Sequence, residues 1–229
     1  MPVWKGLLLS AVKIVLSYFR HSIVYMIIDR TSPRYFIVNK PYDMLSQFAS
    51  EREAPLLGDL GFVFPEGIHA VGRLDRHSEG LLILTTNKKV TRLLFQGDMP
   101  HKRTYLVKVK NAVSHEGLQQ IRNGIKIRVE GGGYYTTAAC EAAIVEPPVD
   151  LFQQAHPFPE YPPFTWMQLS LTEGKFRQIR KMVGTIHHRC QRLIRISIEN
   201  LELGNLPAGG VKEFAEADFF SRLKIENWE

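Results

Sequence analysis

The chain has 229 residues, of which 45% are hydrophobic and 23% charged, a balance that excludes extensive disorder. Its two cysteines, Cys140 and Cys190, lie far apart without CxxC spacing. This excludes a disulfide-stapled secreted scaffold and a cysteine zinc site, and it favours the reducing cytoplasm. The formal charge of +6 hints at an anionic partner, and the charge is concentrated: residues 173–199 carry seven Lys/Arg against two acids, whereas residues 35–172 are neutral.

The N-terminal flank is strongly apolar over residues 6–28, but Lys13, Arg20 and His21 interrupt it. Polar residues at helical spacing predict an amphipathic helix. Three interpretations remain open: a packed or dispensable flank, a helix on a membrane surface, and a signal or anchor. The break at 29–33 predicts that the folded body begins near Arg34, which divides the chain into a flank, 1–33, and a domain, 34–229.

The body alternates strand-like and helix-like patterns. Strands are predicted at 35–39, 68–71, 81–86, 104–110, 165–172 and 192–203, with shorter strand-like runs at 125–129 and 140–145. Helices are predicted at 87–95, 114–122 and 176–185. The proline-rich stretch 147–163 predicts an irregular surface insertion. Because strands outnumber helices and mix with them along the chain, the fold class predicted is α+β.

The helix predicted at 176–185 has two distinct faces. Phe176, Ile179 and Val183 form a stripe suited to the core, and a second face carries Arg177, Arg180 and Lys181. A solvated basic face is one interpretation of this second face. The strand that follows adds Arg189, Arg192 and Arg195, and if both elements feed one surface, a phosphate-binding site is favoured.

A second candidate is the loop Gly72-Arg73-Leu74-Asp75, which lies between two predicted apolar strands. Its aspartate can be a nucleophile, or it can be a local hydrogen-bond acceptor of the turn. The adjacent pair His187 and His188 lacks the same-face spacing of metal ligands. The three glycines at 131–133 lack the lysine and following helix of a phosphate loop, which predicts a simple turn.

These segments together resemble a known family. VGRLDRHSEGLLILTTN at 71–87, KRTY at 102–105, EGKFRQIRKM at 173–182 and CQRLIRISIENLELGNL at 190–206 resemble the ordered motifs of the pseudouridine synthases of the small-subunit-A type. NKPYDMLSQF at 39–48 resembles most the synthase E branch of that family, whose members modify the large ribosomal subunit. The resemblance runs from about residue 34 to the end of the chain.

The resemblance implies a pseudouridine synthase-like fold, with a mixed, mainly antiparallel sheet flanked by helices and a basic cleft. It implies isomerisation of one uridine in 23S rRNA or its precursor particle, in the peptidyl-transferase region, without cofactor or metal. We expect a cytoplasmic monomer that does not bind membranes. Two alternatives stay open: a different rRNA uridine, in 16S or elsewhere in 23S, and a non-catalytic rRNA-binding or ribosome-assembly protein.

The resemblance also implies roles for individual residues. It implies an essential carboxylate and its surroundings, with catalytic roles for Asp75, Tyr105 and Arg180, the last as the ionic partner of the carboxylate. Substrate or RNA contacts are implied for Arg73, Lys40, Arg177, Lys181, Leu193 and Arg195. Because 34 residues cannot hold the N-terminal RNA-binding domain of many sister enzymes, RNA contacts are expected from the catalytic body or the basic flank.

Overall fold

The computed structural model describes residues 32–97, 99–153, 163–226 and 228. The chain divides into two units, Met1–Pro33 and Arg34–Glu229, and only the second is described below. The helix predicted at 6–28 lies outside the described residues. Within the described ranges, no helix has the length and apolar character needed to cross a membrane.

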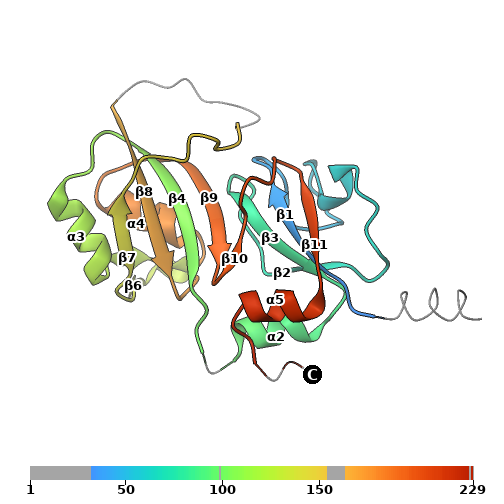
Figure 1. Ribbon diagram of the computed structural model, residues 1–229. Helices are drawn as coiled ribbons and strands as arrows, with labels where there is room; N and C mark the ends of the chain where they lie inside the picture. The colour runs from blue at the N-terminus through green and yellow to red at the C-terminus, as the bar shows by residue number, and fades with distance from the viewer. Residues whose placement is uncertain (1–31, 98, 154–162, 227, 229) are drawn as a thin grey trace, which may run out of the picture. The chain divides into compact units, whose positions relative to one another are not determined.

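A nine-stranded sheet organises the second unit (Figure 1). Its strands, in order across the sheet, are β11 (Val211–Phe214), β1 (Tyr35–Lys40), β3 (Glu79–Thr85), β9 (Cys190–Ile198), β4 (Arg103–Lys110), β8 (Phe164–Leu171) and β7 (Glu141–Ile144). Two short strands pair at the side, β2 (His69–Val71) with β3 and β10 (Leu201–Glu202) with β9. Among the described strands, only the β3–β9 pair is parallel. The α+β class and the mixed, mainly antiparallel sheet are therefore confirmed.

Strand β1 is buried on both faces, which explains the apolar run at 35–38 with which it begins. Because side chains alternate along a strand, Tyr35 and Ile37 pack in one core cluster, and Phe36 and Val38 pack in another. The first cluster is closed by α2 (Lys89–Phe95) and α5 (Glu216–Arg222). The second is closed by the long connection after β1, which includes the short 3₁₀ helix η1 (Leu57–Leu60).

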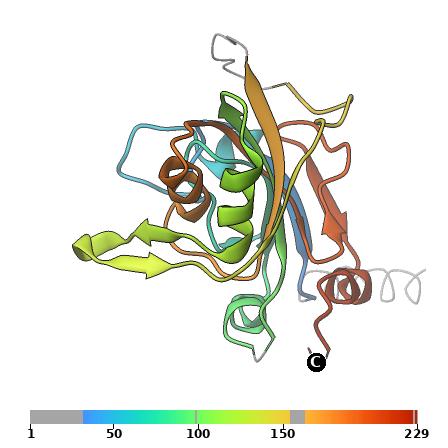
Figure 2. The same cartoon turned by 90° about the vertical axis from the view of Figure 1, so that its left-hand side faces the viewer.

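The other half of the sheet carries α3 (His115–Asn123) and α4 (Gln178–Thr185) on one face (Figure 2). The Ser114 hydroxyl caps α3 by accepting a hydrogen bond from Gly117 N at 3.1 Å, as its sequence position predicts. On α4, Ile179 and Val183 are buried as predicted, but Phe176 is 55% exposed. The core prediction for Phe176 is wrong because α4 begins only at Gln178, so the helical period does not extend to residue 176.

The predicted strand 192–203 is also wrong as a single element. The chain turns at Glu199, where φ is +47°, and residues 201–202 return antiparallel to β9. The turn is stabilised by the Glu199 carboxylate, which accepts a hydrogen bond from Lys102 N at 2.5 Å and pairs with Lys224 Nζ at 2.9 Å. These partners are distant in sequence, so a local pattern does not reveal them.

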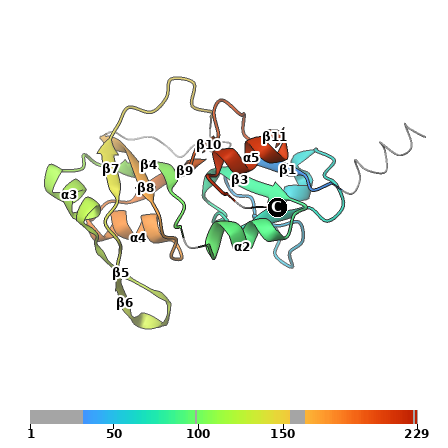
Figure 3. The ribbon, with the colours of Figure 1, turned by 60° about the horizontal axis from the view of Figure 1, so that its bottom comes forward.

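Three further segments complete the fold. The strands β5 (Lys126–Arg128) and β6 (Tyr134–Thr136) form a separate hairpin across η2 (Glu130–Gly132), and it projects away from the sheet (Figures 2 and 3). Residues 147–153 contain neither helix nor strand, and 154–162 lie outside the described residues. The sequence patterns predict neither β11 nor α5.

The seam between the two halves of the sheet positions the site. Strands β3 and β9 pair over only Glu79↔Ile194 and Gly80↔Arg195. Gly80 has φ +97°, and a Cβ atom there would lie 2.3 Å from the carbonyl oxygen of Arg195, so this approach requires glycine. The loop that carries Asp75 ends at this seam, where β3 meets β9.

Candidate active site

A cavity of about 950 Å³ opens beside the seam. Its lining comes from the loop after β1, the loop 72–78, the end of α2, strands β4 and β9, the end of β8, and the segment 173–180 that leads into α4. Eight of the lining residues are basic and two are acidic, which suits a polyanionic ligand. The basic residues are Arg52, Arg73, Arg76, Arg103, Lys175, Arg177, Arg180 and Arg195, and the acidic ones are Asp75 and Glu173.

The backbone around Asp75 is fixed by hydrogen bonds to successive peptide groups. The Ser46 hydroxyl donates to the Leu74 carbonyl at 2.8 Å and accepts from the Leu74 amide at 3.0 Å. The Ser78 amide donates to the Asp75 carbonyl at 2.9 Å, which closes a turn over 75–78. The backbone before Asp75 is therefore fixed by Ser46, and the backbone after it is fixed by the turn that Ser78 closes.

The next two carbonyls of the loop are bound by long basic side chains. Lys40 Nζ donates to the Arg76 carbonyl at 3.2 Å, and Arg180 Nη2 donates to the His77 carbonyl at 2.6 Å. The Arg76 side chain pairs with Asp43 at 2.7 Å. This loop is preorganised, since each of its peptide groups from 74 to 77 has a fixed partner.

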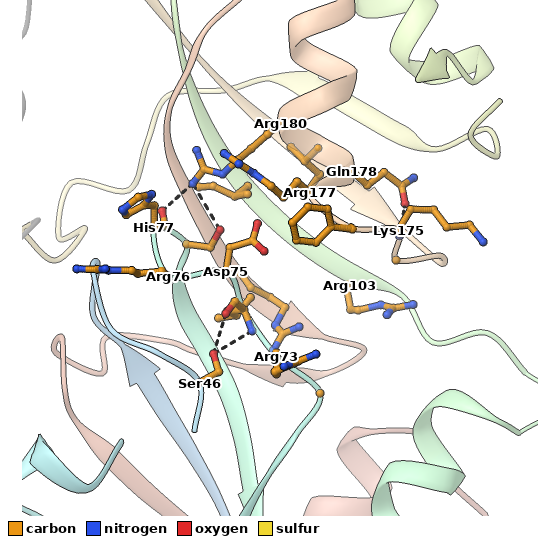
Figure 4. Close-up of a pocket in the computed structure, with 18 of the residues that line it drawn as sticks. Ser46, Arg73, Asp75, Arg76, His77, Arg103, Lys175, Arg177, Gln178 and Arg180 are labelled. Carbon is orange, nitrogen blue, oxygen red and sulfur yellow. Dashed lines mark hydrogen bonds between the residues drawn. The ribbon is translucent and has the colours of Figure 1, made fainter. Parts of the chain in front are cut away.

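The Asp75 carboxylate itself has no hydrogen bond or ion pair among the described residues. Figure 4 shows it directed into the space that Arg73, Arg103, Arg177 and Arg180 surround. The turn is closed by the backbone of Asp75, so the side chain is not consumed as the turn's acceptor. Of the two interpretations that the sequence leaves open, the geometry favours a carboxylate available to a ligand.

The expected ion pair between Asp75 and Arg180 is not formed in this structure, within the residues described. Arg180 instead binds the His77 carbonyl, with its Nη2 3.5 Å from the Ser78 hydroxyl (Figure 4). The motif therefore places Arg180 beside the loop of Asp75, but its guanidinium binds a backbone carbonyl there and not the carboxylate. The motif spacing places α4 against the loop, whereas the choice between carboxylate and carbonyl depends on side-chain rotamers.

Lys40 is buried and is not part of the cavity lining, so its placement does not favour the RNA contact that the resemblance implies. The side chain is fully buried, and Nζ also donates to the carbonyls of Pro41 at 2.7 Å and Met44 at 2.8 Å. Burial lowers the pKa of Lys40 to about 7, against the opposing influence of nearby carboxylates including Glu79 and Asp75. Lys40 therefore stabilises the loop of Asp75 from the protein interior.

The basic residues of β9 are divided between a structural ion pair and the cavity that α4 also lines. Arg192 is buried and pairs with Glu79, Nε to Oε2 at 2.8 Å, and its Nη2 donates to the Phe152 carbonyl at 2.8 Å. Arg195 is 5% exposed, donates from Nε to the Leu81 carbonyl at 2.7 Å, and interacts with the Tyr105 hydroxyl. Burial lowers the pKa of Arg195. Arg192 is therefore structural, whereas Arg195 lines the cavity together with Arg177 and Arg180.

Three cavity arginines retain buried N–H groups without an acceptor among the described residues: Arg103 Nε, Arg180 Nε and Arg195 Nη2. A buried unpaired donor costs free energy, typically about 1–3 kcal/mol for a neutral group and more for a charged one. Acceptors such as phosphate or uracil oxygens would relieve that cost. Arg103 has no role in the site predicted from sequence, although it lies two residues before Tyr105 in the same motif.

The remaining predicted residues are distributed unevenly around the cavity. Tyr105 and the buried Leu193 line it from β4 and β9, and the exposed Arg73 and Arg177 line it from its two loops. Arg177 precedes α4 in a left-handed conformation with φ +54°. Lys181 is absent from the lining, and its Nζ lies 5.4 Å from the ring centroid of Phe176. Among the described residues, no group of His, Cys, Asp and Glu could hold a metal ion.

The sequence profile of the family described as RNA pseudouridylate synthase matches residues 34–184. The chain belongs to this family. The synthase is 32% identical to the ribosomal large subunit pseudouridine synthase E of Vibrio parahaemolyticus, over 81% of this chain and 76% of that protein. It is 34% identical to the protein of the same name from Vibrio vulnificus, over 78% of this chain and 74% of that one. The family and branch that the sequence motifs predict are thus confirmed.

A solved structure described as a pseudouridylate synthase has the same fold. It superimposes with a TM-score of 0.67 at 20% identity, over 83% of this chain and 74% of that one. The human RNA pseudouridylate synthase domain containing 1 superimposes with a TM-score of 0.51 at 15% identity, over 80% of this chain and 79% of that one. The fold that the motifs predict is thus confirmed, and the family match together with the relatives makes the synthase an isomerase.

A carboxylate clamp at the rim of the cavity was not predicted from the sequence of the synthase. Glu173 accepts hydrogen bonds from the Tyr135 hydroxyl at 2.5 Å, the Ala138 amide at 3.0 Å and the Gln178 side chain at 2.6 Å. Burial raises the pKa of Glu173, but these hydrogen bonds outweigh it and hold the pKa below its usual value. The same contact raises the pKa of Tyr135. Glu173 therefore ties the β5–β6 hairpin to the start of α4, and the signal available was its place at the head of the EGKFRQIRKM motif.

Proposed function

We propose that the synthase converts one specific uridine of 23S rRNA, in the peptidyl-transferase region, to pseudouridine, and that Asp75 is its essential carboxylate. The names of the large-subunit relatives support the rRNA class. The observation that carries the proposal is the Asp75 carboxylate, which has no partner among the described residues. It lies on a fixed loop and is surrounded by guanidinium groups. Two of these, on Arg103 and Arg180, have a buried N–H group without an acceptor among the described residues.

The reaction balances without an external reagent. The bond between C1′ and N1 of the uridine breaks, the uracil rotates, and a bond forms between C1′ and C5. One proton leaves C5 and one is taken up at N1, so no atom or electron is gained or lost. Asp75 attacks the ribose at C1′, attacks the base, or assists formation of a glycal, and each route requires an ionised carboxylate.

The arrangement of the cavity suits the other steps. A base within a helix is out of reach, so the uridine must be flipped out at a cost of a few kcal/mol. The Tyr105 ring offers a flat face to the uracil, with its hydroxyl available for the proton at C5. Leu193 closes the pocket against water, which would otherwise compete for the detached base. Arg73 fills the gap that the base leaves in the helix, and Arg177 binds phosphate.

The proposal predicts that wild-type enzyme releases tritium from a 23S transcript carrying uridine labelled at C5. Asp75→Asn keeps the shape of the side chain and removes its charge, so release should fall to background while the thermal unfolding midpoint stays unchanged. Tritium release retained by Asp75→Asn would show that the assignment of Asp75 is wrong.

Two substrate controls separate the alternatives. Release from a 16S transcript, or a modified 23S position outside the peptidyl-transferase region, would correct the target; chemical mapping of pseudouridine in a deletion strain locates it. Tight rRNA binding that is indifferent to Asp75→Asn, without release from any transcript, would identify a non-catalytic RNA-binding protein instead.

A further inference from the structure

Two phenylalanine rings line the cavity yet remain open to solvent. Phe95, at the end of α2, is 42% exposed, and Phe176, in the turn before α4, is 55% exposed. Neither ring lies in the three core clusters of the described residues. Exposed aromatic rings at a concave, charged site are suited to contact with a ligand.

A cation lies close to each ring. The Arg103 guanidinium carbon is 5.8 Å from the Phe95 ring centroid, and Lys181 Nζ is 5.4 Å from the Phe176 centroid. Such cation–π contacts orient a ring and bring positive charge beside it. An aromatic ring beside a cation suits a nucleotide, which presents a flat base and an anionic phosphate.

The Phe95 ring packs against the loop that carries Asp75. Gly72 has φ +70°, and a Cβ atom there would lie 2.9 Å from Phe95 Cζ, so the ring packs directly on this glycine. Arg103 is fixed in turn by its Nη2, which donates to the Thr172 carbonyl at 2.8 Å. Phe95 is therefore built into the cavity wall against Gly72, three positions before Asp75 in the same loop.

We propose that Phe95 and Phe176 are stacking platforms for the unpaired bases that flank the flipped uridine. This inference rests on the proposed function, because it takes the space at Asp75, Tyr105 and Leu193 as the site of the target base. Flipping one nucleotide removes the stacking partner of its neighbours, and an exposed aromatic ring on the protein replaces it. The platforms favour unpaired bases over a regular helix, which makes them determinants of substrate choice.

A protein partner fits this surface less well. The lining that surrounds the two rings carries eight Lys/Arg against two acids, and three of its guanidinium groups keep buried N–H donors without acceptors among the described residues. An apolar peptide segment would cover the rings but leave those donors unpaired. A single-stranded nucleic acid would meet both needs, because its bases can stack on the rings and its phosphate oxygens can accept hydrogen bonds from the donors.

The test measures stacking without turnover, in the Asp75→Asn background. The probe is a short single-stranded RNA with one uridine flanked on each side by 2-aminopurine, whose fluorescence is quenched on stacking. Phe95→Ala and Phe176→Ala should each weaken binding about 5- to 100-fold, and Phe→Tyr should restore it. Phe→Leu keeps apolar bulk without a π face and should bind like the alanine variant, which guards against a loss caused by misfolding. Phe62→Ala, on an exposed ring outside the cavity, should have no effect.

An abasic site beside the uridine supplies the matching change on the RNA. If a ring stacks on that base, removing the base should weaken RNA binding by the wild-type protein as much as removing the ring does. The two losses of affinity should then not add when both changes are combined. Additive losses, full binding by both alanine variants, or absence of any quenching would overturn the inference. Because no step depends on isomerisation, failure of the tritium assay would count against the proposed function alone.

Discussion

Lys40 is a buried side chain that fixes the loop carrying Asp75. Its ammonium has three N–H donors and meets three carbonyls, of Pro41, Met44 and Arg76. The last of these belongs to the loop of Asp75, one residue beyond the carboxylate. The strand that begins the domain is thereby tied to the geometry of the site.

Replacing this lysine should therefore change how stability depends on pH. Burial lowers the pKa of Lys40 from its usual 10.5 to about 7, so between these values the unfolded chain binds one more proton than the folded one. The contribution is unfavourable below about pH 7 and is relieved as the pH rises, by up to about 1.4 kcal/mol per pH unit. The unfolding free energy of wild type, minus that of Lys40→Met, should rise with pH above about 7.

Urea unfolding at about pH 6 and about pH 9 measures this difference. Lys88→Met, at an exposed lysine, serves as the control and should leave the pH dependence of wild type unchanged. A difference between wild type and Lys40→Met that stays flat with pH would contradict the prediction.

Single residues mark the limit of prediction from this sequence. The motifs locate Asp75, Tyr105 and Leu193, all of which line one cavity. They misassign Arg192, whose partner Glu79 is 113 residues away, because the charge pattern of a strand does not state which face is covered. An arginine in a basic segment is expected at the surface until its long-range partner is known.

Among the elements, the β5–β6 hairpin depends on one carboxylate for its attachment to α4. Glu173 accepts from Tyr135 on β6, from the amide of Ala138, and from Gln178 in the first turn of α4. Gln178 is itself buried and accepts from the Lys175 amide at 2.8 Å. The clamp thus joins a projecting hairpin to the element that positions Arg177 and Arg180.

Glu173→Ala should release this hairpin while leaving the sheet intact. The Ala138 amide loses its acceptor, so its hydrogen exchange should accelerate at least ~10-fold, whereas the amide of Ile83 in the central sheet should be unchanged. Site-resolved exchange by NMR measures both in one sample. Acceleration at Ile83 as well would mean that the carboxylate supports the whole domain, and unchanged exchange at Ala138 would mean that the clamp has no effect.

Element boundaries were predicted well where the pattern is local and poorly where it is not. Helix α3 has its predicted serine cap, and the eight-residue β4 matches its alternating sequence. The start of α4 differs because Arg177 takes a left-handed conformation, which no helical period signals. Strand β11 is four residues long, and its only described strand partner is β1 near the other end of the domain.

For the whole molecule, charge location is more informative than net charge. The formal charge is +6, but the basic residues that matter gather around one cavity. Arg192 and Lys40, which also contribute to the count, are buried in structural roles. A sequence can therefore indicate an anionic partner, and the fold decides which charges meet it.

This distribution predicts the salt dependence of RNA binding. Arg177→Gln removes one exposed cation from the cavity. Because glutamine, like arginine, carries a Cβ atom, the strain of the left-handed conformation at this position is the same in both proteins. The slope of log affinity against log salt concentration should become shallower by about 0.7 to 1, as expected for the loss of one phosphate contact. Filter binding of a 23S transcript across a salt series measures it. Lys212→Gln, on β11 outside the cavity, is the control, and an equal change there would show that the charge acts only through the overall field.

The pairing of β1 with β11 has a consequence for how the protein is made. Strand β1 is completely buried between β3 and β11, and the Phe219 and Phe220 rings of α5 pack on its Tyr35. During synthesis on the ribosome, β1 emerges early and keeps one unpaired, apolar edge until residues 211–220 follow. Closing the domain is thus a late, long-range step. A chain released before residue 211 would present this edge to other nascent chains, so translation must reach the last strand before the first one is safe from aggregation.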